Sequence, residues 1–90
     1  MATFTDAQAM HARYPATFEV PSADELAAVR IGSIVKICAD EIERFWVEVT
    51  SVNGDTLDGI IDNDLKDTNI HQLKIGDVVS FNRRHIYQIY

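Results

Sequence analysis

The sequence is poor in the features that mark secreted and membrane proteins. It has one cysteine, Cys38, so no disulfide can form within the chain and a reducing compartment fits best. No stretch approaches the run of about 18 apolar residues that a membrane span needs. Residues 1–6 lack the basic and apolar regions of a signal peptide. We therefore expect a cytoplasmic protein without a membrane partner.

Basic residues are also scarce. Eight Lys and Arg stand against fourteen Asp and Glu, which gives a formal net charge of -6. This sign disfavours a nucleic-acid partner, because cationic side chains must displace the counterions of a phosphate backbone. The acidic residues concentrate between residues 40 and 67. A protein partner with a basic surface would be attracted to this segment. In the alternative, the segment is a solvated face whose charge keeps the protein soluble.

The remaining composition is that of a packed globular protein. Of the 90 residues, 47% are hydrophobic and 24% are charged. A chain of this length has room for one domain, so we predict a single domain over residues 1–90. The apolar pattern changes near Gly32, which divides the domain into a helical part, residues 1–30, and a β-rich part, residues 31–90.

The helical part contains two pairs of residues with the spacing of a capping box, in which two side chains satisfy free backbone groups at a helix start. These pairs are Thr5 with Gln8 and Ser22 with Glu25. They predict short helices over about residues 6–13 and 23–29. Residues 17–20, which precede a proline, are predicted to be an edge strand.

In the β-rich part, apolar and polar residues alternate as they do in half-buried strands. Asn53-Gly54 is a strong signal for a type I′ hairpin turn. We predict five or six antiparallel strands, the last two paired with each other, over residues 33–38, 44–52, 56–62, 77–81 and 85–90. Such strands would form a small, partly open SH3-like barrel, so the predicted fold class is α+β.

Two segments of the chain resemble each other. Val29–Ile37 and Leu73–Phe81 share apolar, basic, Ile-Gly and Val positions. A glycine before an apolar strand suits a tight turn with positive φ. We interpret the pair as one strand-initiating turn used twice, with the isoleucine before each glycine packed beneath it.

The motifs of the C-terminal half also resemble a known family. They are Glu43–Val49, Gly59–Asp64, Ile70-His71, Gly76-Asp77 and His85-Ile86. Together they resemble the bacterial YegJ-like family of uncharacterised proteins. The resemblance implies a small α+β domain without an assigned activity. Asp64 and Gln72 depart from the proline and glycine that the family pattern has there.

Trp46 is the sharpest functional signal in the sequence. It shares one face of its predicted strand with Glu48, opposite Phe45 and Val47. An exposed tryptophan is a typical anchor of a binding surface. Our leading hypothesis is a non-enzymatic protein-interaction module, monomeric or a small homo-oligomer, that binds through Trp46 and Glu48. In the alternative, Trp46 packs under the N-terminal helices.

Two other functions stay open. A small-molecule or metal-dependent site near Asp62, Asn63 and His71 would lie between the helices and the sheet. No zinc-binding or catalytic motif surrounds these residues, so we predict no metal, no cofactor and no catalytic residue, and favour a protein that is not an enzyme. Weak nucleic-acid binding through Arg83 and Arg84 is the third hypothesis.

Overall fold

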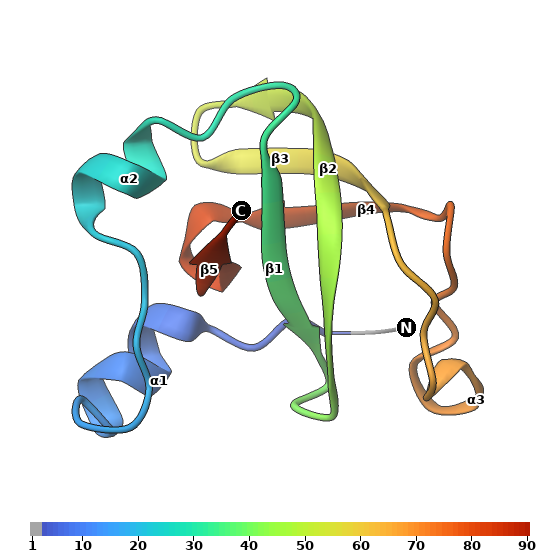
Figure 1. The fold of residues 1–90 in the computed structure, drawn as a ribbon, viewed down its shortest axis with the longest axis horizontal. Helices are drawn as coiled ribbons and strands as arrows, with labels where there is room; N and C mark the ends of the chain where they lie inside the picture. The colour runs from blue at the N-terminus through green and yellow to red at the C-terminus, as the bar shows by residue number, and fades with distance from the viewer. Residues whose placement is uncertain (1–2) are drawn as a thin grey trace.

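The computed structural model describes residues 3–90, which form a five-stranded antiparallel sheet with three short helices (Figure 1). The strand order is β4-β3-β2-β1-β5, and the sheet is open between β4 and β5. The predicted α+β class is confirmed. The elements are α1 (Ala7–Arg13), α2 (Ala23–Ala27), β1 (Ile34–Ala39), β2 (Glu43–Asn53), β3 (Thr56–Ile61), α3 (Thr68–His71), β4 (Val78–Asn82), the 3-10 helix η1 (Arg83–His85) and β5 (Gln88–Ile89).

Helices α1 and α2 each begin at a side-chain cap. At α2 the predicted capping box between Ser22 and Glu25 is confirmed, with both hydrogen bonds formed. At α1 the cap is Asp6, whose carboxylate accepts a 3.0 Å hydrogen bond from a backbone N–H. The predicted Thr5–Gln8 box is therefore wrong. Aspartate is the stronger N-cap residue, and it occupies the position one residue later.

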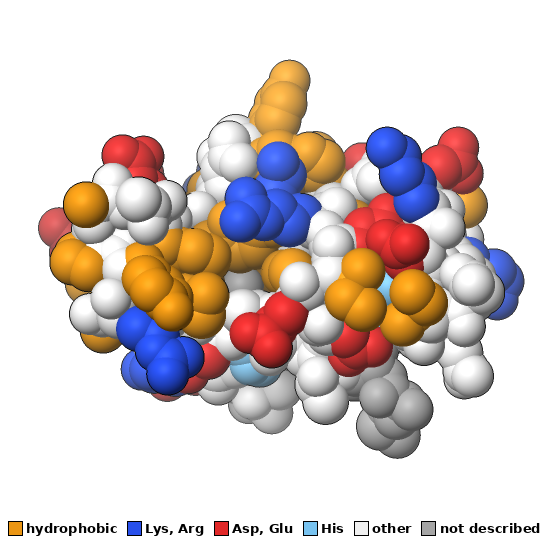
Figure 2. All heavy atoms as spheres, turned by 90° about the horizontal axis from the view of Figure 1, so that it is seen from below, with side chains coloured by type: hydrophobic (Ala, Val, Ile, Leu, Met, Phe, Trp, Pro, Cys, Tyr) orange, Lys and Arg blue, Asp and Glu red, His pale blue; other side chains and the backbone are white. Residues whose placement is uncertain are grey.

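Residues 17–20 form no strand, contrary to the prediction. The edge of β1 that faces away from β2 is already hydrogen-bonded to other segments. The Thr5 N–H donates to the Cys38 carbonyl at 3.0 Å, and the Tyr87 N–H donates to the Lys36 carbonyl at 3.2 Å. Residues 17–20 instead pack against this region through Phe18. Figure 2 shows the hydrophobic side chains that gather over this N-terminal part, at the left of the view.

Strands β4 and β5 do not pair with each other, which corrects a second prediction. β4 pairs with β3, and β5 pairs with β1 at the opposite edge. Helix η1 carries the chain between the two edges. Its turn is stabilised by Asn82, whose side chain accepts a 3.0 Å hydrogen bond from the Arg84 N–H, and by His85, whose Nδ1 accepts one from the Asn82 N–H at 2.9 Å. A capped helical turn thus replaces the predicted hairpin.

The predicted repeated turn is confirmed at Arg30–Ser33 and Lys74–Asp77. The glycine of each turn has a positive φ, 93° at Gly32 and 89° at Gly76. In each turn the last side chain accepts a hydrogen bond from the first N–H, at 3.0 Å and 3.1 Å. Each glycine N–H then donates to a core strand, at 2.8 Å and 2.9 Å. Both turns therefore fix the start of a strand in the same way.

The isoleucine of each turn does not pack beneath it as predicted. Ile31 is 66% exposed and Ile75 is 51% exposed. Because the glycine N–H faces the sheet, the side chain before it lies on the outside of the turn.

The hydrophobic core lies on one face of the curved sheet. The inward residues of β2 are Phe45, Val47 and Val49, as the alternation predicts, and all three are buried. Leu26 of α2 and Phe4 pack against this core. Within residues 3–90, no helix has the length and apolar character needed to cross a membrane.

Candidate functional site on the outer face of the sheet

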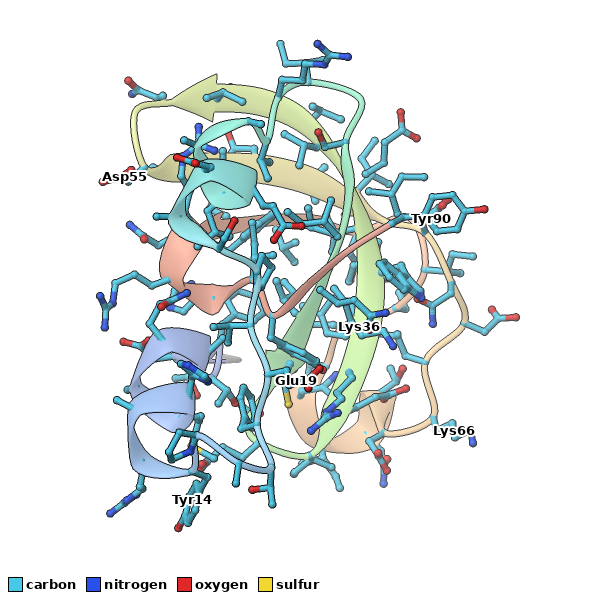
Figure 3. The ribbon with its side chains drawn as sticks, turned by 60° about the vertical axis from the view of Figure 1, so that its left-hand side comes forward. Tyr14, Glu19, Lys36, Asp55, Lys66 and Tyr90 are labelled. Atoms are coloured by element: carbon cyan, nitrogen blue, oxygen red, sulfur yellow. The ribbon has the colours of Figure 1, made fainter. Side chains whose placement is uncertain are left out.

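Trp46 lies on the outer face of β2, half-buried by neighbours on the same face. Lys36 of β1 is its cross-strand partner, and the ammonium group lies 4.8 Å from the centroid of the indole ring. Tyr90 packs edge-on against the indole, with 6.1 Å between ring centroids. Figure 3 shows Lys36 and Tyr90 on this face, with α1 and α2 to their left. The two buried clusters that include residues of these helices do not contain Trp46. Trp46 is therefore half-buried by residues of its own face and is not part of the buried clusters of the N-terminal helices.

Apolar side chains continue from Trp46 across the outer face. Val78 of β4 faces Ile60 of β3, Ile60 faces Glu48 of β2, and Glu48 faces Ile34 of β1. Val78 is 68% exposed and Ile60 is 40% exposed. We call the apolar residues of this surface the outer-face band: Ile34, Trp46, Ile60, Val78 and Tyr90. Apolar side chains that lie together on a surface, unlike single ones, indicate an interaction site.

Acidic side chains accompany the outer-face band. Glu48 is exposed and lies within the row of apolar residues. Asp62 is exposed directly after β3, and its N–H donates a 2.9 Å hydrogen bond to the Trp46 carbonyl. Three of the predicted site residues, Trp46, Glu48 and Asp62, are therefore neighbours.

Asn63 has a positioning role next to Trp46. Its side-chain oxygen accepts a 2.7 Å hydrogen bond from the Trp46 N–H, and its amide group donates to the Asp64 carbonyl at 2.9 Å. The amide thus ties the end of β3 to β2 and is used within the protein.

His71, the fifth predicted site residue, lies at a separate place. Its side chain is fully buried, and its Nε2 lies 2.9 Å from Oε1 of Glu43. Its Nδ1 accepts a 3.1 Å hydrogen bond from the Leu73 N–H. Because Nδ1 is an acceptor, the proton of a neutral ring is on Nε2 and is donated to Glu43. Glu43 shares the inward register of Phe45 and Val47, so His71 does not join the face that carries Trp46.

Glu43 also accepts hydrogen bonds from the N–H groups of Lys66 and Asp67, at 2.7 Å and 2.8 Å. Burial acts to raise the pKa of Glu43, but the hydrogen bonds from His71 and these two N–H groups outweigh it and hold the pKa below its ordinary value. This carboxylate fixes the β3–β4 connection, including α3, to the start of β2. The sequence offered one signal for it, a charged residue in an inward strand position that requires a partner.

The remaining charged candidates are engaged within the protein. Arg83 donates to the carbonyls of Leu26 and Val29 at 2.6 Å and 3.1 Å, and Arg84 forms a 3.0 Å ion pair with Asp6. Among residues 3–90, no three His, Cys, Asp or Glu side chains are placed to hold a metal ion.

Comparison with known proteins gave no match to the chain. This holds for protein-family models, for curated proteins and for solved structures. The resemblance of the C-terminal half to the YegJ-like family stays a prediction.

Proposed function

We propose that this protein is a non-enzymatic interaction module that binds a protein partner with a basic surface through the outer-face band. The observation that carries the proposal is the outer-face band, on the face opposite the core. Its members Ile60, Val78 and Tyr90 are exposed, and Ile34 and Trp46 are half-buried. Exposing this area to water is unfavourable, and a partner that covers it gains about 25 cal/mol per Å² of apolar surface.

The second part of the proposal is that the sheet curls into an SH3-like, partly open small barrel. Three features support it. Helix η1 crosses from one sheet edge to the other, and the register of β2 shifts between Val49 and Ser51, which increases local twist. At Gly59, a Cβ would collide with the Val47 side chain and lie 2.7 Å from the Glu48 carbonyl oxygen. The absence of a side chain there lets β2 and β3 approach closely.

Trp46 has the properties of an anchor for such a partner. The Lys36 ammonium lies over the indole and limits its rotamers, so less side-chain entropy is lost when a partner covers the ring. Glu48 and Asp62 stand beside it and suit Lys or Arg side chains of the partner, which supports the basic character of that surface.

The other two hypotheses have less support. A ligand or metal at His71 would have to displace both hydrogen bonds of a fully buried ring. A nucleic acid at Arg83 and Arg84 would have to compete with carbonyl groups and with Asp6 for the two guanidinium groups.

The test is comparative affinity capture from native cells with the wild type and two variants. Trp46→Ala removes the anchor, whereas Tyr14→Ala removes an aromatic ring that is 48% exposed at the end of α1. We expect a partner that wild type and Tyr14→Ala retain and Trp46→Ala loses. With that partner purified, Trp46→Ala should weaken binding by about 30-fold or more, the loss typical of an anchor residue. A partner retained equally by all three proteins would contradict the outer-face band as the binding surface.

A further inference from the structure

A small cavity lies between the sheet and the N-terminal part of the chain, apart from the outer-face band. Its volume is about 110 Å³, which corresponds to about three or four water molecules. Its walls come from segments far apart in sequence, including Thr5, Phe18, Cys38 and Tyr87. In Figure 2 the surface is hollowed between the α1 side at the left and the β1–β2 turn at the centre.

Two of the residues that line the cavity carry a hydroxyl group without a hydrogen-bond partner. The oxygens Oγ1 of Thr5 and Oη of Tyr87 are buried and unpaired among residues 3–90. Tyr87 as a whole is only 9% exposed. A buried polar group without a partner costs about 1–3 kcal/mol, and in native proteins such groups usually meet water or a ligand.

A cation lies over two aromatic rings that line the cavity. The guanidinium of Arg44 lies 4.8 Å from the centroid of the Tyr87 ring and 5.8 Å from that of Phe18. Arg44 faces Cys38 across the β1–β2 pair, and no carboxylate lies within ion-pair distance of it among the residues that the structure describes. Burial raises the pKa of Tyr87, so its hydroxyl stays protonated and available as a donor.

The chemistry of the cavity defines its ligand. Two hydroxyl donors and a guanidinium call for an anion with two acceptor oxygens, and a planar carboxylate matches the guanidinium best. Met10 and Phe18 add apolar walls that suit a short hydrocarbon chain. Glu41 also lines the cavity, and its negative charge disfavours anions of higher charge. We propose that this cavity binds a short-chain monocarboxylate, with its oxygens at Thr5, Tyr87 and Arg44.

Butyrate is a suitable probe, and butyramide is its neutral control of equal size. Titration of the isotope-labelled protein should shift the amide signals around Thr5, Cys38 and Tyr87 saturably with butyrate and not with butyramide. Because Cys38 is the only cysteine, its rate of alkylation by iodoacetamide is a second readout. We expect bound butyrate to slow that rate.

Tyr87→Phe keeps the ring and removes one donor, so it should weaken butyrate binding by about tenfold, the effect of one hydrogen bond to a charged group. Tyr14→Phe is the matched control and should bind as the wild type does. Trp46→Ala should also bind butyrate normally, which separates this site from the proposed partner surface. The proposal is overturned if butyrate and butyramide act alike, or if Tyr87→Phe binds butyrate as tightly as the wild type. The first result would show that the negative charge is not recognised, and the second that the Tyr87 hydroxyl is not part of the site.

Discussion

Glu43 shows how a single side chain can hold a long connection in place. Its carboxylate receives three N–H donors, one from the His71 ring and two from the backbone of residues 66 and 67. Hydrogen bonds to a charged acceptor are about twice as strong as neutral ones. The ionisation of this one group therefore strengthens the three bonds that hold residues 66–71 against β2.

We expect Glu43→Gln to lower the free energy of unfolding by about 2 kcal/mol at neutral pH, because an amide is a weaker acceptor than a carboxylate. Folding lowers the pKa of Glu43, so its contribution is present above its ordinary value of 4.5 and is lost as the pH falls further. Urea titrations of wild type and variant should therefore differ near pH 7 and converge in acid.

The matched control is Glu41→Gln, since Glu41 is exposed on the neighbouring turn. It should change the free energy of unfolding by less than about 0.5 kcal/mol. A Glu43→Gln deficit that persists unchanged in acid would mean that the loss arises from packing and not from charge.

Helix α2 has only five residues, so its own backbone hydrogen bonds cannot keep it folded. Arg83 supplies additional hydrogen bonds at the C-terminal end of this helix. Its guanidinium caps the carbonyls of Leu26 and Val29 and also donates to the Gly54 carbonyl at 3.2 Å. One side chain thus joins the end of α2 to the β2–β3 turn.

We expect Arg83→Met to destabilise the protein by about 1–3 kcal/mol, because it leaves these carbonyls without their donor. Amide hydrogen exchange should rise most in residues 23–29. Arg84→Met removes an ion pair between side chains that are 59% and 40% exposed, so it should cost less than about 1 kcal/mol. Equal effects of the two substitutions would show that α2 is held by something other than Arg83.

The sequence correctly predicts the helices and strands whose position is determined by residues close together in the chain. The alternation of apolar and polar residues locates all five strands to within a few residues, and the Ser22–Glu25 capping box locates the start of α2. The start of α1 is predicted to within one residue, but from a capping box that does not form. Helix α3 was missed because its position depends on Glu43, which lies far away in sequence. The pairing of β5 with β1 and the contact between Lys36 and Trp46 were missed for the same reason, since both depend on tertiary packing.

At the scale of the whole molecule, acid acts on stability in two pH ranges. Burial lowers the pKa of His85, whose Nδ1 must stay unprotonated to accept the Asn82 N–H. Its contribution is therefore lost as the pH falls below its ordinary value of 6.5. In the second range, hydrogen bonds from Ser22 and Thr3 lower the pKa values of Glu25 and Asp40, so these groups lose their contributions only in stronger acid.

We expect the melting temperature to fall in these two steps, with the lowest solubility between them, near the isoelectric point of about 4.8. His85→Gln keeps a side-chain acceptor at the third position of η1 and removes the titration, so it should abolish the first step. Thermal melts at successive pH values measure both steps. A first step that survives in His85→Gln would assign it to another group.

The two matching turns at Arg30–Ser33 and Lys74–Asp77 bear on the order in which the chain folds. Each closes through hydrogen bonds between residues three apart, so each loses little loop-closure entropy and can form early. The pairing of β5 with β1 joins Val35 to Ile89 and closes most of the sheet into one loop. Contacts so distant in sequence form slowly. We therefore expect β1 and β4 to be initiated independently, and β5 to add to the sheet last.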